Sequence, residues 1–306
     1  MQISLGFSPC PNDTFIFDAL VHQRIDTEGL SFDVRLGDVE ELNRLAFAGA
    51  LDVTKLSYHA FGYLTEQYAL LNAGSALGRG VGPLLVTADE ALAEKLVAQG
   101  DGPEFRTSSG SSLQIAGDGA QVQRMWASGK VAIPGKYTTA NYLLGLAFPA
   151  IEHKEAILFS DIEREVLAGN FTAGLLIHEN RFTYRDRGLH KIADLGEFWE
   201  STTGLPIPLG GIVVNKKLDP AVQKTVDRVL ARSVAYAFEH PEASAAYVAA
   251  HAQEMDPEVR RKHINLYVND FSRDLGPEGR RAVTAFLQQG RERGVIPAGP
   301  EDIFVA

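Results

Sequence analysis

Residues 4–17 read Ser4-Leu-Gly-Phe-Ser-Pro-Cys-Pro-Asn-Asp-Thr-Phe-Ile-Phe17, and the rest of the chain is interpreted from this stretch. The apolar run at its start predicts a short β-strand. Pro9 and Pro11 follow, and they disfavour both strand pairing and helix because proline lacks a backbone N–H and restricts the residue before it. Asn12, Asp13 and Thr14 are good helix N-caps, and the apolar residues from Phe15 onward recur at helical spacing. The stretch therefore predicts a strand, a rigid turn and a capped helix.

The turn is also a candidate ligand site. In open α/β sheets, ligands bind beyond the carboxyl ends of the strands, and the first N–H groups of a helix favour an anion. We therefore include Asn12 and Asp13 among the predicted substrate-binding residues. The alternative is an ordinary loop between a strand and a helix.

The composition restricts the class of protein. The chain has 306 residues, of which 45% are hydrophobic, so its length suggests two domains or lobes. A net charge of −10 argues against binding to nucleic acid or to an anionic membrane surface, so an anionic small molecule would need a focused local site. Cys10 is the single cysteine, which excludes internal disulfides and a cysteine-based metal cluster. We read it as a packed side chain in the turn rather than a nucleophile.

No export signal or membrane span is expected. Met1 and Gln2 lead directly into the first predicted strand, without a basic region or an apolar leader segment. No run approaches the roughly 18 apolar residues that span a bilayer. A cytoplasmic protein is the prediction, and the sequence does not specify an oligomeric state.

One supersecondary pattern occurs twice. Asp38 and Glu41 have capping-box spacing at the start of a predicted helix, and a strand at 51–56 follows and places Lys55, Leu56 and Ser57 at its end. Ser160 and Glu163 repeat this spacing about 120 residues later, before a strand at 173–177. The repeat favours one βαβ plan in each of two α/β lobes, and coincidence between two generic units is the alternative.

A second turn before a helix lies in the middle of the chain. The strand 131–133 is followed by Pro134-Gly-Lys-Tyr137 and then by Thr138, Thr139 and Ala140 at the start of a helix. Threonine hydroxyls and first-turn N–H groups together form an anion site.

Glycine-rich segments at 74–83 and 204–211 are the predicted crossovers between the lobes, since glycine allows hinges and close backbone approach. The predicted parts are residues 1–84 for the first lobe, 85–206 for the second, and 207–306 for the return to the first lobe with C-terminal helices. The segment 100–129 looks like a surface excursion, and no function is assigned to it.

Among eight histidines, His178 stands apart. It follows the apolar run Gly174-Leu-Leu-Ile177, so it is expected at the mouth of the cleft between the lobes. Histidine has an ordinary pKa of about 6.5, which suits a base near neutral pH. A hydrogen-bonded structural histidine is the alternative. No histidine pair has the spacing of a known metal motif, so no metal site is predicted.

Several literal motifs resemble the 1,4-dihydroxy-6-naphthoate synthase family, enzymes of the futalosine route to menaquinone. The first is Ser8-Pro-Cys-Pro-Asn-Asp-Thr-Phe-Ile-Phe17. The others occur in family order: Lys55-Leu-Ser-Tyr58, Gly78-Arg-Gly-Val-Gly-Pro83, Pro134-Gly-x-x-Thr-Thr-Ala140, His178-Glu-Asn-Arg-Phe-Thr-Tyr184 and Gly204-Leu-Pro-x-Pro-Leu-Gly210. The similarity covers most of the chain and is looser in the late helices, and the 100–129 excursion is longer than the family pattern.

This resemblance implies an α/β fold with two lobes, that of type II periplasmic binding proteins, with C-terminal helices. It implies a carbon–carbon lyase that cleaves cyclic dehypoxanthinyl futalosine to 1,4-dihydroxy-6-naphthoate and dihydroxyacetone, with no cofactor. His178 would be the proton acceptor. Lys55, Leu56 and Ser57 would bind the anionic substrate together with Thr138, Thr139 and Ala140. Arg79 would hold the substrate carboxylate, or would instead pair with an acidic residue of the protein.

Two other functions remain open at this point. One is a cytoplasmic solute-binding protein of the same fold, against which the missing signal peptide counts. The other is a chorismate dehydratase, a sister enzyme that shares the fold. The motifs that begin at Ser8 and His178 favour the synthase.

Overall fold

A computed structural model of the chain describes residues 1–98, 104–106, 112–114, 129–178, 180–253 and 256–305. It divides into two compact units. Unit 1 comprises Met1–Gly78 and Pro208–Ala306, and unit 2 comprises Arg79–Ile207. The chain thus leaves unit 1 and returns to it, and each unit is described by itself below.

Unit 1 is built on a mixed sheet whose strand order is β2-β1-β3-β13-β4, with β5 also paired to β13. Strands β1, β2 and β3 run parallel, whereas β13, from the returning segment, is antiparallel to β3 and β4. The strands are β1 (Gln2–Phe7), β2 (Ser31–Leu36), β3 (Val53–Ser57), β4 (Tyr68–Leu70), β5 (Ala76–Gly78) and β13 (Ile207–Asn215).

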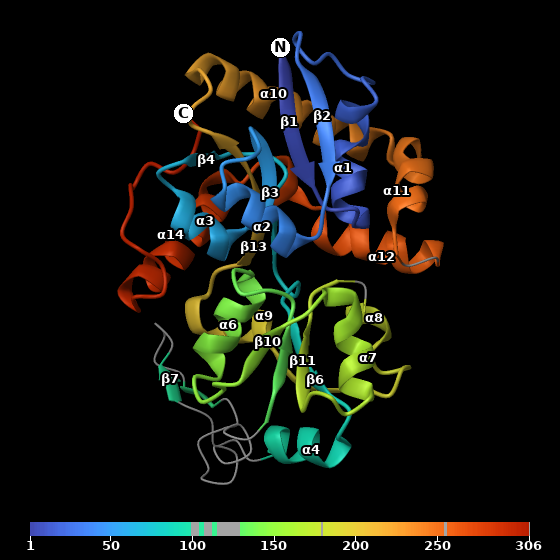
Figure 1. Ribbon diagram of the computed structural model, residues 1–306, viewed down its shortest axis with the longest axis vertical. Helices are drawn as coiled ribbons and strands as arrows, with labels where there is room; N and C mark the ends of the chain where they lie inside the picture. Colours follow the sequence, from blue (N-terminus) through green and yellow to red (C-terminus); the bar gives the residue numbers. More distant parts are fainter. Residues whose placement is uncertain (99–103, 107–111, 115–128, 179, 254–255, 306) are drawn as a thin grey trace. The chain divides into compact units, whose positions relative to one another are not determined.

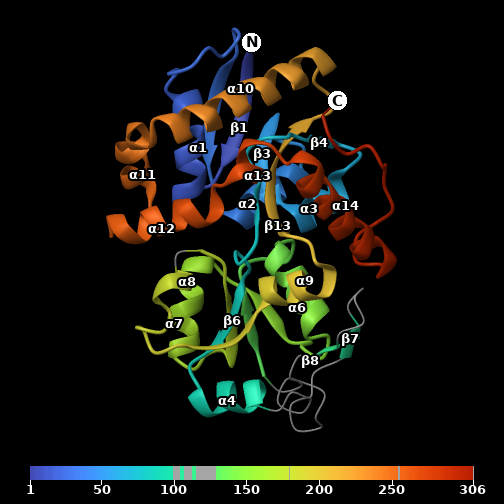
Figure 2. The ribbon, with the colours of Figure 1, turned by 180° about the vertical axis from the view of Figure 1, so that it is seen from behind.

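Helices from both ends of the chain pack on this sheet. Helix α1 packs against α10, α11 and α12, so the start of the chain is covered by its last third (Figures 1 and 2). The α-helices of unit 1 are α1 (Pro11–Val21), α2 (Val39–Phe47), α3 (Tyr58–Leu64), α10 (Pro220–Glu239), α11 (Ala245–His251), α12 (Pro257–Tyr267), α13 (Asp270–Arg273) and α14 (Gly276–Glu292).

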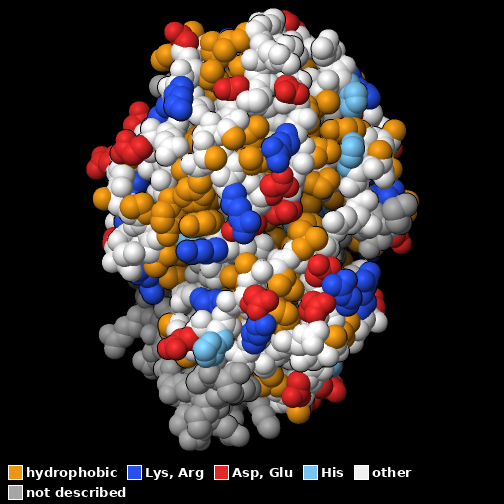
Figure 3. All heavy atoms as spheres, viewed as in Figure 1, with side chains coloured by type: hydrophobic (Ala, Val, Ile, Leu, Met, Phe, Trp, Pro, Cys, Tyr) orange, Lys and Arg blue, Asp and Glu red, His pale blue; other side chains and the backbone are white. Residues whose placement is uncertain are grey.

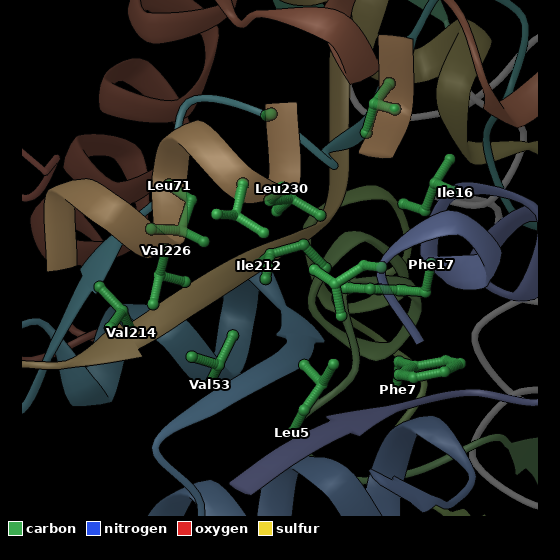
Figure 4. Close-up of a cluster of buried hydrophobic side chains, with 14 of the residues drawn as sticks. Leu5, Phe7, Ile16, Phe17, Val53, Leu71, Ile212, Val214, Val226 and Leu230 are labelled. Carbon is green, nitrogen blue, oxygen red and sulfur yellow. The ribbon is translucent and has the colours of Figure 1, made fainter. Parts of the chain in front are cut away.

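The core of unit 1 joins these segments. Figure 4 shows side chains of β1, α1 and β3 meeting side chains of β13 and α10, among them Leu5, Val53, Ile212 and Leu230. Phe7 and Phe17 stack with ring centroids 4.4 Å apart, which fixes the angle between β1 and α1. The core thereby positions the turn that connects these two elements.

Unit 2 has a sheet of strand order β10-β9-β11-β6-β12 and a separate two-stranded sheet, β7-β8. Strands β9, β10 and β11 are parallel, and β6 is antiparallel to β11 and β12. The strands are β6 (Leu84–Thr87), β7 (Glu104–Arg106), β8 (Ser112–Gln114), β9 (Val131–Ile133), β10 (Lys154–Ala156), β11 (Ala173–Leu176) and β12 (His190–Asp194). The described α-helices of unit 2 are α4 (Glu90–Ala98), α6 (Thr139–Ala147), α7 (Ile162–Leu167), α8 (Asn180–Thr183) and α9 (Leu195–Thr203).

Two predicted helix starts are wrong. Helix α1 begins at Pro11 after Cys10, which makes no side-chain cap, so Asn12, Asp13 and Thr14 lie inside its first turn. Ser160 lies in the short 3-10 helix Phe159–Asp161 that precedes α7, and it does not cap that helix. Most of the segment 100–129 lies outside the described residues.

Candidate functional site

The carboxylate of Asp13 is the centre of a buried polar cluster in unit 1. One oxygen, Oδ2, accepts from the backbone N–H of Ser8 at 3.2 Å and from its hydroxyl at 2.7 Å. The other, Oδ1, accepts from the Asn12 amide at 2.8 Å and from the Lys55 ammonium at 2.6 Å. Asp13 is 1% exposed, so its charge is compensated by the Lys55 ion pair and by hydrogen bonds, as burial requires.

Lys55, Leu56 and Ser57 end strand β3. Lys55 is 8% exposed, and within the described part of the chain Asp13 is the acceptor of its ammonium, which has three N–H donors. Ser57 donates its N–H to Asn43 Oδ1 at 3.0 Å, and its hydroxyl accepts from the same amide at 3.3 Å. The strand end is therefore held rigidly by side chains from α1 and α2.

The returning strand β13 fits closely against this strand end. Gly210 pairs with Ser57 and Gly211 with Leu56. A Cβ on Gly210 would lie 2.9 Å from the Leu56 carbonyl oxygen, and one on Gly211 would lie 3.0 Å from the Tyr58 hydroxyl. The two glycines of the predicted crossover thus allow β13 to pack beside Lys55 and Leu56.

His263, from α12, joins this cluster although sequence reasoning assigned it no role. Its Nε2 lies 3.0 Å from Asn12 Oδ1, and the side chain is 1% exposed. The two residues are 251 positions apart in the chain. No local motif signals such a contact, and it could only have been found from the packing of the late helices.

Thr138, Thr139 and Ala140 begin helix α6 in unit 2, as predicted, and all three are buried. The Thr138 hydroxyl donates to the Gly135 carbonyl at 2.8 Å and accepts from the Asn141 N–H at 3.3 Å. Thr138 is therefore the N-cap of the helix, and its hydroxyl stabilises the turn.

His178 lies two residues beyond the end of β11 and is half-buried. Its ring contacts Phe159, with centroids 4.3 Å apart and planes at 59°. Its backbone carbonyl accepts from the N–H of Arg181 at 3.0 Å. An imidazole held at a strand end by an aromatic ring and a fixed backbone can exchange a proton with a bound molecule.

Arg181 anchors the segment that carries His178. Its guanidinium donates to the carbonyls of Gly80, at 3.0 Å, and Gly82, and to the Asp194 carboxylate at 2.7 Å. Asp194 also caps α9 by accepting from Gly196 N–H at 2.8 Å. The first crossover, α8 and α9 are thereby linked through one side chain.

A second anchor of this segment is Asn180, whose amide donates to Glu163 at 2.8 Å. Arg187 also pairs with Glu163, at 2.7 Å. The carboxylate that was expected in a capping box therefore holds the His178 segment against α7.

Arg79 is exposed and donates to the Gly204 carbonyl at 3.0 Å. The next residue, Gly80, donates its N–H to Glu200 at 2.7 Å. The two predicted crossover segments are thus in direct contact through Arg79.

The tyrosine that follows Ser57 in the chain is fully buried. Burial raises the pKa of Tyr58, and its hydroxyl forms a hydrogen bond with the Ser75 hydroxyl at 2.8 Å. Within the described residues, no three His, Cys, Asp or Glu side chains are grouped to hold a metal ion.

None of the described helices combines the length and apolar character needed to cross a bilayer. On the face shown in Figure 3, acidic and basic side chains are interspersed.

The comparisons with known proteins agree over nearly the whole chain. The family described as menaquinone biosynthesis matches residues 3–292. A 1,4-dihydroxy-6-naphthoate synthase from Thermus thermophilus is 43% identical over 303 residues, covering 99% of this chain and 99% of its own. A synthase of the same name from Streptomyces coelicolor is also 43% identical over 303 residues, covering 98% of this chain and 96% of its own.

Solved structures show the same architecture. A crystal structure of a protein from Archaeoglobus fulgidus is 30% identical with a TM-score of 0.79, covering 96% of this chain and 98% of that chain. The alkanesulfonate-binding protein of Xanthomonas axonopodis pv. citri is similar in fold alone, at 13% identity and a TM-score of 0.65 over 99% of this chain and 96% of that chain. The chain thus has the two-lobed periplasmic binding protein fold that the motifs predicted.

Proposed function

The chain belongs to the 1,4-dihydroxy-6-naphthoate synthase family of menaquinone biosynthesis, a family of lyases, and from this premise we propose its reaction. The proposed substrate is cyclic dehypoxanthinyl futalosine. Cleavage of a carbon–carbon bond releases 1,4-dihydroxy-6-naphthoate and dihydroxyacetone. The reaction removes a proton without net oxidation or reduction, so the proposal includes no cofactor.

His178 is the proposed proton acceptor. The observation that supports this role is its place two residues beyond strand β11, half-buried against Phe159 and inside a segment anchored by Arg181 and Asn180. A base must be held within hydrogen-bond reach of the proton it takes, and positioning of this kind contributes about 10²–10⁴-fold to a rate. Only the neutral imidazole can accept the proton.

The proposed contacts to the anionic substrate come from both units. In unit 1 they are the Lys55 ammonium, the Leu56 main chain and Ser57, with Asn12 and Asp13 beside them. In unit 2 they are Thr139, the Ala140 N–H and the cap residue Thr138, at the start of a helix whose free N–H groups favour an anion. Arg79 is the proposed partner of the carboxylate, in competition with its contact to Gly204.

The proposal is tested by incubating the purified protein with cyclic dehypoxanthinyl futalosine and, separately, with a chorismate-type substrate. Products are identified by mass spectrometry. Formation of 1,4-dihydroxy-6-naphthoate with dihydroxyacetone is the expected result. Dehydration of the chorismate-type substrate would assign the sister activity instead. Binding without turnover of either compound would identify a solute-binding protein.

A further inference from the structure

We propose that His263 is a positioning residue for substrate binding, which acts through Asn12 and Asp13 to fix the ammonium group of Lys55. This inference rests on the proposed function, in which Lys55 contacts the anionic substrate. It assigns a role in the site to the C-terminal helix α12, which the motifs of the sequence do not include.

The two hydrogen bonds that link His263, Asn12 and Asp13 have a single consistent assignment of donors and acceptors. The Asp13 carboxylate can only accept, so the group of Asn12 that lies 2.8 Å from it must be the amide NH₂. The carbonyl oxygen of Asn12 therefore faces His263, whose Nε2 must carry a proton and donate to it at 3.0 Å. The Asp13 carboxylate thus sets the amide orientation, and His263 stabilises it by donating to the carbonyl oxygen, because a flipped amide would place its oxygen against the carboxylate and its NH₂ against the Nε2–H of His263.

Burial makes this orientation important for Lys55. His263 and Asp13 are each 1% exposed and Lys55 is 8% exposed, so little water is available to replace a lost partner. Lysine has a flexible stem, and its ammonium is located here by the Asp13 Oδ1 atom at 2.6 Å. Asn12 donates to that same oxygen. Loss of the His263 hydrogen bond would leave the Asn12 amide less firmly held. It would therefore disturb the hydrogen bond that Asn12 donates to Oδ1, the oxygen that positions the Lys55 ammonium.

The consequence is specific to binding. Lys55 is proposed to contact the substrate, and no residue of this chain of contacts is proposed to take the proton. Loss of the His263 hydrogen bond should raise KM, while kcat, which depends on His178 in unit 2, should change little. A histidine that merely stabilised α12 would lower the thermal midpoint and leave KM of the folded protein unchanged.

The test compares two substitutions with a matched control. His263→Phe keeps an aromatic ring beside Tyr267 but removes the donor, whereas His263→Gln offers an N–H near the position of Nε2. His251 also packs on a tyrosine, Tyr247, at the same centroid distance of 4.7 Å, and it belongs to α11, so His251→Phe is the control. His263→Met replaces the Phe variant if that protein does not fold.

We expect His263→Phe to raise KM about 5- to 10-fold with kcat within about 2-fold of wild type, the size of one buried hydrogen bond. His263→Gln and His251→Phe should leave KM within about 2-fold of wild type. An unchanged KM in a folded His263→Phe protein would overturn the inference. So would an equal rise of KM in the Phe and Gln variants, because a donor would then be irrelevant.

A measurement without substrate separates this inference from the proposed reaction. The side-chain amide signals of Asn12 in a ¹⁵N–¹H spectrum of the substrate-free protein should shift in His263→Phe and stay near their wild-type positions in His263→Gln. If wild-type protein does not turn over the proposed substrate, the proposed function fails and the Asn12 signals still decide the chain of contacts. Unshifted Asn12 signals in His263→Phe would refute it.

Discussion

At the residue scale, substitution of His178 distinguishes a lyase from a solute-binding protein. His178→Ala removes the proposed proton acceptor and leaves the anion contacts in place. The side chain is half-buried at a strand end, so the variant should stay folded. Substrate should still bind, while single-turnover rates fall by at least about 10²-fold. His190→Ala, at another half-buried histidine of unit 2, is the control and should keep its rate. Near-normal turnover by a folded His178→Ala protein would end the catalytic assignment.

The pH dependence of the wild-type rate tests the same residue. An imidazole accepts a proton only when it is neutral. Acidification below the ordinary pKa of histidine, about 6.5, should therefore lower the rate. Circular dichroism at each pH must show that the protein remains folded. A rate that is flat across this range, in a folded protein, would require another base.

Thr139 is the better of the two threonines for testing the anion contacts of unit 2. The Thr138 hydroxyl caps α6, so its loss would also destabilise the helix. Thr139→Val removes a hydroxyl and keeps the shape, and should weaken substrate binding by about 1–2 kcal/mol in calorimetry. Thr202→Val, whose hydroxyl bonds back to the Phe198 carbonyl within α9, is the control. Equal affinities of all three proteins would remove Thr139 from the site.

The sequence predicts individual site residues only where a local pattern exists. The end of strand β3, the start of α6 and the end of β11 lie where the motifs indicated. The direction of the Asp13 carboxylate toward Lys55 was not predictable, since 42 residues separate the two. The contact of His263 with Asn12 depends on the path of the whole chain.

At the element scale, helix starts were predictable where one side chain decides them. Asp38 caps the helix that follows it, as its position before a helical pattern indicated, and Asp219 and Asp256 cap α10 and α12 in the same way. Ser160 does not cap α7 because it lies within the 3-10 turn before that helix, and Glu163 instead accepts hydrogen bonds from Asn180 and Arg187. Capping spacing alone cannot show that a carboxylate has a stronger tertiary partner.

Two glycines of the first crossover, Gly80 and Gly82, are expected to differ in how much stability an alanine substitution costs. A Cβ on Gly82 would overlap the backbone nitrogen and Cα of Gly196, and backbone atoms cannot move aside cheaply. Gly80 has open space around its Cβ position and a φ of +68°, so Gly80→Ala costs only backbone strain of about 1 kcal/mol. In urea titrations, Gly82→Ala should therefore lower the free energy of unfolding by clearly more than Gly80→Ala does. Equal losses would contradict the close packing of the crossover on α9.

At the scale of the whole molecule, the class of fold was predictable and the pairing of distant segments was not. Alternating strands and helices, with glycine-rich crossovers, indicated two α/β lobes. The antiparallel insertion of β13 between β3 and β4 had no local signal, because an apolar run of this kind does not specify its neighbours. The ion pairs between the N-terminal and C-terminal parts of unit 1 were equally unpredictable from the sequence. Glu28 binds Arg228 at 2.6 Å and Arg232 at 3.0 Å, about 200 positions away.

These ion pairs give the molecule a predictable acid response. Hydrogen bonding from Arg228, with a further contribution from Arg232, lowers the pKa of Glu28 from 4.5 to about 2. A carboxyl whose pKa is lower in the folded state adds stability above its unfolded pKa, and this stability is lost as pH falls from about 4.5 toward 2. The difference in free energy of unfolding between wild type and Glu28→Gln should therefore be largest near neutral pH and shrink over this range. Because the carboxylate is solvent-exposed, 1 M salt should also reduce the difference. Arg228→Gln should reproduce the loss, and a difference that is constant from pH 7 to 2 would show that Glu28 does not link the two parts of unit 1 as a charge.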